Sequence, residues 1–149
     1  MQKAIRENLH YGATGIKIVV DDYRYIYSAD DIQFMVEEAA SAGVKIVAHC
    51  VTDRGAQNAI EAGVASIEHG FEMSDETLEF AKRRGVVLFG TELPKSLQDL
   101  YGRGDRYAPI LDRLKRAHRI GVEMAFGADI LRQTPGYTRG QLCLTPIDT

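Results

Sequence analysis

Two histidines, a threonine and an aspartate follow Gly-Val pairs at regular spacing along the chain. His49, His69 and Thr91 each lie six residues after the glycine of such a pair, and Asp129 lies eight residues after the glycine of a fourth. Imidazole is the commonest metal ligand in proteins, and catalytic zinc usually takes three protein ligands. A carboxylate beside a metal can orient or deprotonate water. The pattern therefore predicts a metal site at His49 and His69, with Asp129 as the neighbouring carboxylate.

Each of these residues also has a structural interpretation. A single histidine at a strand end is more often a hydrogen-bonded structural residue than a ligand. Thr91 by itself is a weak indication, because a threonine there can simply satisfy backbone groups. We favour a site because two histidines share one offset and an aspartate follows the last strand. His10 and His118 fall on polar helical faces, where we expect them to be solvated.

Lys17 interrupts an apolar run that should form a buried strand. An unpaired buried ammonium is costly, so lysine is almost never fully buried without a partner. Either Lys17 reaches solvent or pairs with Asp21, Asp22 or Glu68, or a lowered pKa frees its amine for chemistry. A neutral amine can react with carbon dioxide to give a carbamate, which is a carboxylate able to ligate or bridge metal ions.

The elements that would position these residues alternate regularly. Glycine is favoured just past a helix end, and a short apolar run after it is typical of a strand buried on both faces. Ser28 with Asp31 resembles a capping box, and Ser74 begins a second capped helix. Helical periodicity covers residues 1–10, about 28–39, 55–62, 74–84 and 109–120. This alternation predicts an α/β fold with five parallel strands, crossover helices, and ligands beyond the carboxyl ends of the strands.

Length and composition narrow the class of protein. The chain has 149 residues and a formal net charge of -3, which suits one domain but falls short of the roughly 200 residues of a complete (β/α)8 barrel. Its scattered charge predicts no nucleic-acid partner, and we expect no membrane span or signal peptide. Cys50 and Cys143 form no disulfide framework, which favours a reducing, cytoplasmic location. We expect an irregular tail over residues 131–149.

Four segments resemble the amidohydrolase superfamily, most closely its imidazolonepropionase-like and Xaa-Pro dipeptidase-like branch. They are Gly15-Ile16-Lys17-Ile18, Val47-Ala48-His49, Ser66-Ile67-Glu68-His69-Gly70 and Ala125-Phe126-Gly127-Ala128-Asp129. The resemblance implies a metal-dependent hydrolase on a (β/α)8 barrel of TIM type. By this resemblance Lys17 would be a carboxylated lysine, His49 and His69 metal ligands, and Asp129 a metal ligand or general base. We expect the metal to be a divalent ion, zinc above all.

The family pattern is only partly present. Family members begin their site with a His-x-His pair on strand one, whereas no two of the four histidines here are separated by one residue. Residues 1–130 therefore resemble a partial barrel, which we expect to hydrolyse an amide-type C–N bond in a small amide or dipeptide. The alternative is an inactive or partial barrel module that assembles with itself or another chain and so covers its open sheet edges. A metal-free module binding a small anion is weaker, because no Gly-rich phosphate loop is present.

Overall fold

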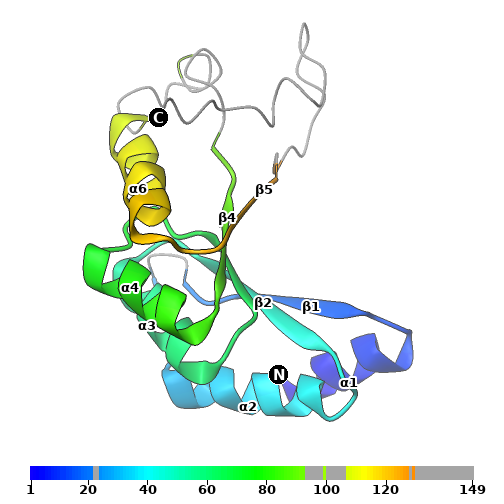
Figure 1. The fold of residues 1–149 in the computed structure, drawn as a ribbon. Coiled ribbons are helices and arrows are strands. Elements are labelled where there is room, and N and C mark those ends of the chain that lie inside the picture. The colour runs from blue at the N-terminus through cyan, green and yellow to red at the C-terminus, as the bar shows by residue number, and fades with distance from the viewer. Residues whose placement is uncertain (22–23, 93–98, 100–106, 128, 130–149) are drawn as a thin grey trace, which may run out of the picture.

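Helices and strands alternate along the chain in the predicted order (Figure 1). The computed structural model describes residues 1–21, 24–92, 99, 107–127 and 129. Its strands are β1 (Gly15–Val19), β2 (Lys45–Cys50), β3 (Ser66–His69), β4 (Val87–Gly90) and β5 (Met124–Phe126). Its helices are α1 (Gln2–His10), α2 (Ala29–Ala40), α3 (Asp53–Ala62), α4 (Asp75–Arg84) and α6 (Tyr107–Ile120). The tail predicted for residues 131–149, including Cys143, lies outside the described residues.

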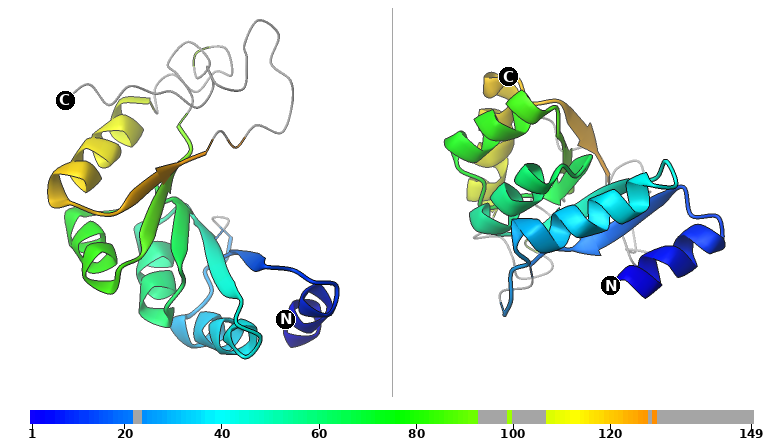
Figure 2. Two further views of the ribbon diagram at one scale, coloured as in Figure 1. Left: turned by 45° about the vertical axis from the view of Figure 1, so that its right-hand side comes forward. Right: turned by 90° about the horizontal axis from the view of Figure 1, so that it is seen from below.

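The sheet is parallel throughout. Its spatial order, β1-β2-β3-β4-β5, is also the order of the strands in the sequence. Consecutive helices pack against each other, α1 on α2, α2 on α3, α3 on α4 and α4 on α6. Figure 2 shows these helices as an arc along one side of the splayed strands. The architecture is that of part of a (β/α) barrel, which confirms the fold class predicted from the sequence.

Hydroxyl side chains begin three of the helices. The side chains of Ser28, Thr52 and Ser74 each accept a hydrogen bond from the backbone N–H three residues further on. Such an N-cap stabilises its helix by about 1 kcal/mol. Gly63 and Gly85 end α3 and α4 in the left-handed conformation, where a glycine avoids the steric penalty of a Cβ. The starts predicted at Ser28 and Ser74 are confirmed, whereas α3 begins earlier than predicted because Thr52 caps it.

The two faces of the sheet differ in exposure. On the helix-covered face, one residue from each of four strands is at most 8% exposed: Ile16, Ile46, Ile67 and Leu88. On the opposite face, Lys17 and Val19 are exposed, while Val47, His49 and Phe89 are half-buried. The prediction that the strands are buried on both faces is therefore wrong for β1, β2 and β4, whereas Ser66 of β3, the register partner of Val47, is only 4% exposed. The helices in the described ranges cover one face, and the other face carries Lys17 and His49.

The outer strands of the described sheet carry exposed apolar side chains. Val19 of β1 is 44% exposed and Phe126 of β5 is 47% exposed.

Cys50, at the end of β2, is a buried free thiol. Burial together with the negative charge of Asp21 raises the pKa of this thiol. None of the helices in the described ranges is long and apolar enough to cross a membrane.

Candidate active site

His49 and His69 come together at the carboxyl ends of β2 and β3. Their ring centroids are 4.4 Å apart and their planes are inclined at 68°. This contact is unexpected from strand alternation, because the register pairs His49 with Glu68 and pairs His69 with the fully buried Cys50. The backbone of His69 has a left-handed φ of 73°, which is unusual for a residue with a Cβ and which recurs at functional sites. The bend at the end of β3 therefore accompanies the meeting of the two imidazoles.

The residue after His69 must be small. Gly70 also has a positive φ, of 59°, and a Cβ there would lie 2.6 Å from Sδ of Met73. A side chain at this position would thus clash with the buried Met73 and strain the backbone. The two consecutive left-handed residues form the turn that ends β3.

His69 is held neutral by its surroundings. It is only 5% exposed, and its Nδ1 lies 2.6 Å from Oγ1 of Thr91 at the end of β4. Burial, with smaller contributions from the positive charges of His49 and Lys17, lowers the pKa of His69 to about 4. At neutral pH the ring therefore has one lone pair free for a hydrogen bond or a metal. Thr91, a weak candidate in the sequence, is the direct partner of a predicted ligand.

Lys17 pairs with Glu68 on the uncovered face of the sheet. Its Nζ forms an ion pair with Oε2 of Glu68, and the two side chains are 47% and 22% exposed. Lys17 is opposite Val47 in the register, so it lies on the same face as His49, which is two residues further along β2. The structure thus pairs Lys17 with Glu68 and gives it an exposed amine rather than a buried one, while the predicted alternative Asp22 lies outside the described residues.

Asp129 lies beyond β5 and is exposed, with a left-handed φ of 45°. Its negative charge, like that of Glu68, raises the pKa of His69 and so opposes the effect of burial. The other three predicted site residues, His49, Asp129 and Lys17, therefore all act electrostatically on the imidazole of His69. Within the described part of the chain, no three His, Cys, Asp or Glu side chains come together as a metal-binding cluster. Without modification, the site offers the two imidazoles and the amine of Lys17.

Asp21 has a structural role instead of pairing with Lys17. It is fully buried, and its carboxylate accepts hydrogen bonds from the N–H of Val51 (2.8 Å), the N–H of Thr52 (3.0 Å) and the hydroxyl of Thr52 (2.7 Å). Gly55 faces this carboxylate so closely that a Cβ would lie 2.1 Å from Oδ2. Asp21 therefore ties the end of β1 to the start of α3, beside the segment that carries His49.

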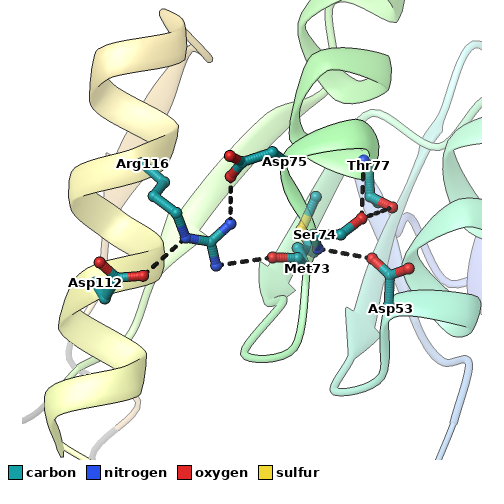
Figure 3. A network of polar contacts seen from close by, with 7 residues as sticks. All are labelled: Asp53, Met73, Ser74, Asp75, Thr77, Asp112 and Arg116. Carbon is teal, nitrogen blue, oxygen red and sulfur yellow. Dashed lines mark hydrogen bonds and ion pairs between the residues drawn. The ribbon is translucent and has the colours of Figure 1, made fainter.

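A second polar network links three of the helices (Figure 3). The guanidinium of Arg116 in α6 donates to Asp75 at 2.6 Å and to the backbone carbonyl of Met73 at 3.1 Å. The N–H of Ser74 donates in turn to Asp53 at 2.8 Å. These bonds link the start of α3, the start of α4 and the middle of α6. They hold three consecutive βα units in place at the end of the sheet where the histidines lie.

Sequence reasoning missed Glu92 and Arg113. They form a buried ion pair, and Glu92 is the residue that follows Thr91 in the chain. A signal for Arg113 is present in the sequence. It follows Ile110 by three residues and precedes Leu114 and Ala117, all of which are buried on the inner side of α6. A charged residue on the apolar face of a helix needs a buried partner. The sequence alone does not name that partner.

The sequence and the fold are similar to those of known proteins. The profile of the amidohydrolase family matches residues 2–137. An uncharacterized protein of Mycobacterium tuberculosis is 26% identical over 145 residues, which cover 85% of this chain and 39% of that protein. The crystal structure of an amidohydrolase superimposes with a TM-score of 0.79 at 28% identity and covers 87% of this chain and 37% of its own. A Xaa-Pro dipeptidase with methionine bound in its active site gives 0.75 at 26% identity, covering 91% and 39%. The chain thus spans about two-fifths of the length of these relatives.

Proposed function

Because the chain belongs to the amidohydrolase family, we propose that its site serves the metal-dependent hydrolysis of an amide-type C–N bond. The observation that carries this proposal is the convergence of His49 and His69, with ring centroids 4.4 Å apart at the carboxyl ends of adjacent parallel strands. Similarity to a Xaa-Pro dipeptidase favours a dipeptide or acylated amino acid as the substrate.

The residues present fit a divalent ion, for which we expect zinc. His69 is neutral at physiological pH and needs to lose no proton before it binds. His49 lies beside it, and Lys17 lies on the same face of the sheet. We assign the metal to His49, His69 and the carbamate of Lys17. The chemistry such an ion supplies is activation of water for attack on the carbonyl carbon.

In the carboxylation of Lys17, the neutral amine and one molecule of carbon dioxide form a carbamate and release one proton. The amine that reacts is the neutral form, so the ion pair with Glu68 has to open first. Once formed, the carbamate brings a negative charge next to Glu68, and a divalent cation offsets that repulsion. Metal and carbon dioxide are therefore expected to bind cooperatively.

Asp129 is the proton acceptor in this proposal. It follows β5 at the same end of the sheet, and its charge already acts on His69. An exposed carboxylate can accept the proton of the attacking water and return it to the leaving amine.

The outer strands of the described sheet support a second candidate function. Val19 of β1 and Phe126 of β5 are exposed, and the five described strands do not close an eight-stranded barrel. In this alternative the chain is a partial barrel that becomes complete, and active, by assembling with a second copy or with another chain. Both candidates predict at most weak activity for a monomer of 149 residues.

Zinc content and oligomeric state, measured on the same sample, test both candidates. The chain is loaded with zinc in the presence of bicarbonate, and hydrolysis of a dipeptide panel is followed. His49→Asn and His69→Asn are expected to lose bound zinc, whereas His118→Asn, at an exposed position on α6, is the matched control. Wild-type zinc content in the two site variants would refute the metal site. Near-normal turnover by a monomer, shown by light scattering, would refute the need for assembly.

A further inference from the structure

His69 belongs to a closed series of contacts. Its Nδ1 lies 2.6 Å from Oγ1 of Thr91, and its ring centroid lies 5.2 Å from that of Phe71. Glu92, which follows Thr91, forms an ion pair with Arg113 of α6. The guanidinium carbon of Arg113 lies 5.9 Å from the ring centroid of Phe71, which leads back to His69. Arg113 of α6 is thus connected to His69 in two ways, through Phe71 and through Glu92 and Thr91.

The Glu92–Arg113 pair in this series is deeply buried. Its two side chains are 1% and 0% exposed. Burial raises the pKa of Glu92 and lowers that of Arg113, in each case against the effect of the partner's charge. Nε and Nη1 of Arg113 have no hydrogen-bond partner within the described ranges. A buried pair with unsatisfied donors is a poor source of stability, which favours a role in fixing geometry.

The carboxylate of Glu92 is folded back on the strand end that carries Thr91. The backbone of Glu92 and of Thr91 each lowers the pKa of Glu92 slightly, against the larger effect of burial, which raises it. Gly90 leaves the room for this arrangement, since a Cβ there would lie 2.8 Å from Oε2 of Glu92. The ion pair is therefore placed to anchor the strand end that carries Thr91, and its guanidinium also lies near Phe71, a ring neighbour of His69.

We propose that Glu92 and Arg113 are positioning residues that hold Thr91 against Nδ1 of His69, so that His69 carries its proton on Nδ1 and presents Nε2 to a metal ion. The choice of nitrogen rests on the proposed metal-dependent function. A neutral imidazole has a single N–H, and in this proposal the hydroxyl of Thr91 accepts it from Nδ1, which leaves Nε2 free to ligate. Outer partners of this kind typically change metal affinity by about 10- to 100-fold.

The experiment uses ¹⁵N chemical shifts of the His69 ring in the metal-free chain at neutral pH, assigned by comparison with His69→Asn. These shifts report the tautomer, which a purely structural role of the ion pair does not change. Thr91→Val removes the hydroxyl at nearly constant shape. The double variant Glu92→Met/Arg113→Met replaces the whole pair by apolar side chains, so neither charge is left buried alone. Arg116→Met, which removes an ion-paired arginine from the same helix, is the matched control.

The proposal predicts the Nδ1–H tautomer in the wild type and in Arg116→Met. Thr91→Val and the double variant are expected to lose this preference and to bind zinc about 10- to 100-fold more weakly after bicarbonate loading. An Nε2–H tautomer in the wild type would overturn the proposal, as would wild-type shifts in a folded double variant or in Thr91→Val. An Nδ1–H tautomer that depends on Thr91, in a chain that binds no zinc, would support the positioning role and refute the metal-dependent function.

Discussion

Replacing Gly55 by alanine tests how rigidly Asp21 ties β1 to α3. A Cβ at position 55 would lie 2.1 Å from Oδ2 of Asp21 and 3.1 Å from Oγ1 of Thr52. The carboxylate has no free space to move into, because Asp21 is fully buried. It also accepts three hydrogen bonds, from Val51 and Thr52, that it would lose on moving. The substitution therefore either breaks some of these hydrogen bonds or displaces the start of α3.

The free energy of unfolding is expected to fall by several kcal/mol. Alanine in place of glycine in a helix is favourable by about 1 kcal/mol. Each hydrogen bond to a charged group contributes about 1.5–3 kcal/mol, and displacing the carboxylate of Asp21 breaks at least two. The losses outweigh the gain in helix propensity, so Gly55→Ala is expected to destabilise the chain by about 2–5 kcal/mol.

Urea denaturation followed by circular dichroism measures this effect in two backgrounds. In the wild type, Gly55→Ala should lower the unfolding midpoint. In Asp21→Ala the obstructing carboxylate is absent, so the same substitution should raise the free energy of unfolding by about 1 kcal/mol. A loss of equal size in both backgrounds, or no loss in the wild type, would refute the steric argument.

Two further predictions concern pH and the helix network. Burial keeps His69 unprotonated in the folded chain down to a pKa of about 4, whereas an unfolded histidine binds a proton near pH 6.5. The metal-free chain should therefore lose up to about 3 kcal/mol of stability as the pH falls from 6.5 to 4, and His69→Asn should lose less over the same range in parallel denaturation curves. Arg116→Met should destabilise the chain by about 1 kcal/mol, because its carboxylate partners Asp75 and Asp112 are exposed. A melting temperature equal to that of the wild type would contradict this estimate.

Much of the fold follows from signals that act over a few residues. Ser28 and Ser74 cap helices through atoms only three residues away, and Gly63 and Gly85 end helices through their own backbone freedom. The apolar runs between them are short enough to be strands, and alternation of helix and strand leaves a parallel sheet as the arrangement expected. The end of the sheet at which His49 and His69 meet follows from the same reasoning, since parallel strands share one carboxyl edge.

The arrangement of groups within the site depends on contacts between distant segments. Lys17 pairs with Glu68, 51 residues away, and Glu92 pairs with Arg113, 21 residues away. The sequence allows Asp21, Asp22 or Glu68 as the partner of Lys17, because it does not specify the register between the strands. Alternation of side chains along β3 would place His69 on the helix-covered face of the sheet, together with its register partner Cys50. Its ring nevertheless meets His49, at a residue whose φ of 73° no local sequence rule predicts. Local propensities thus account for the elements, while register, burial and one left-handed residue decide which side chains meet.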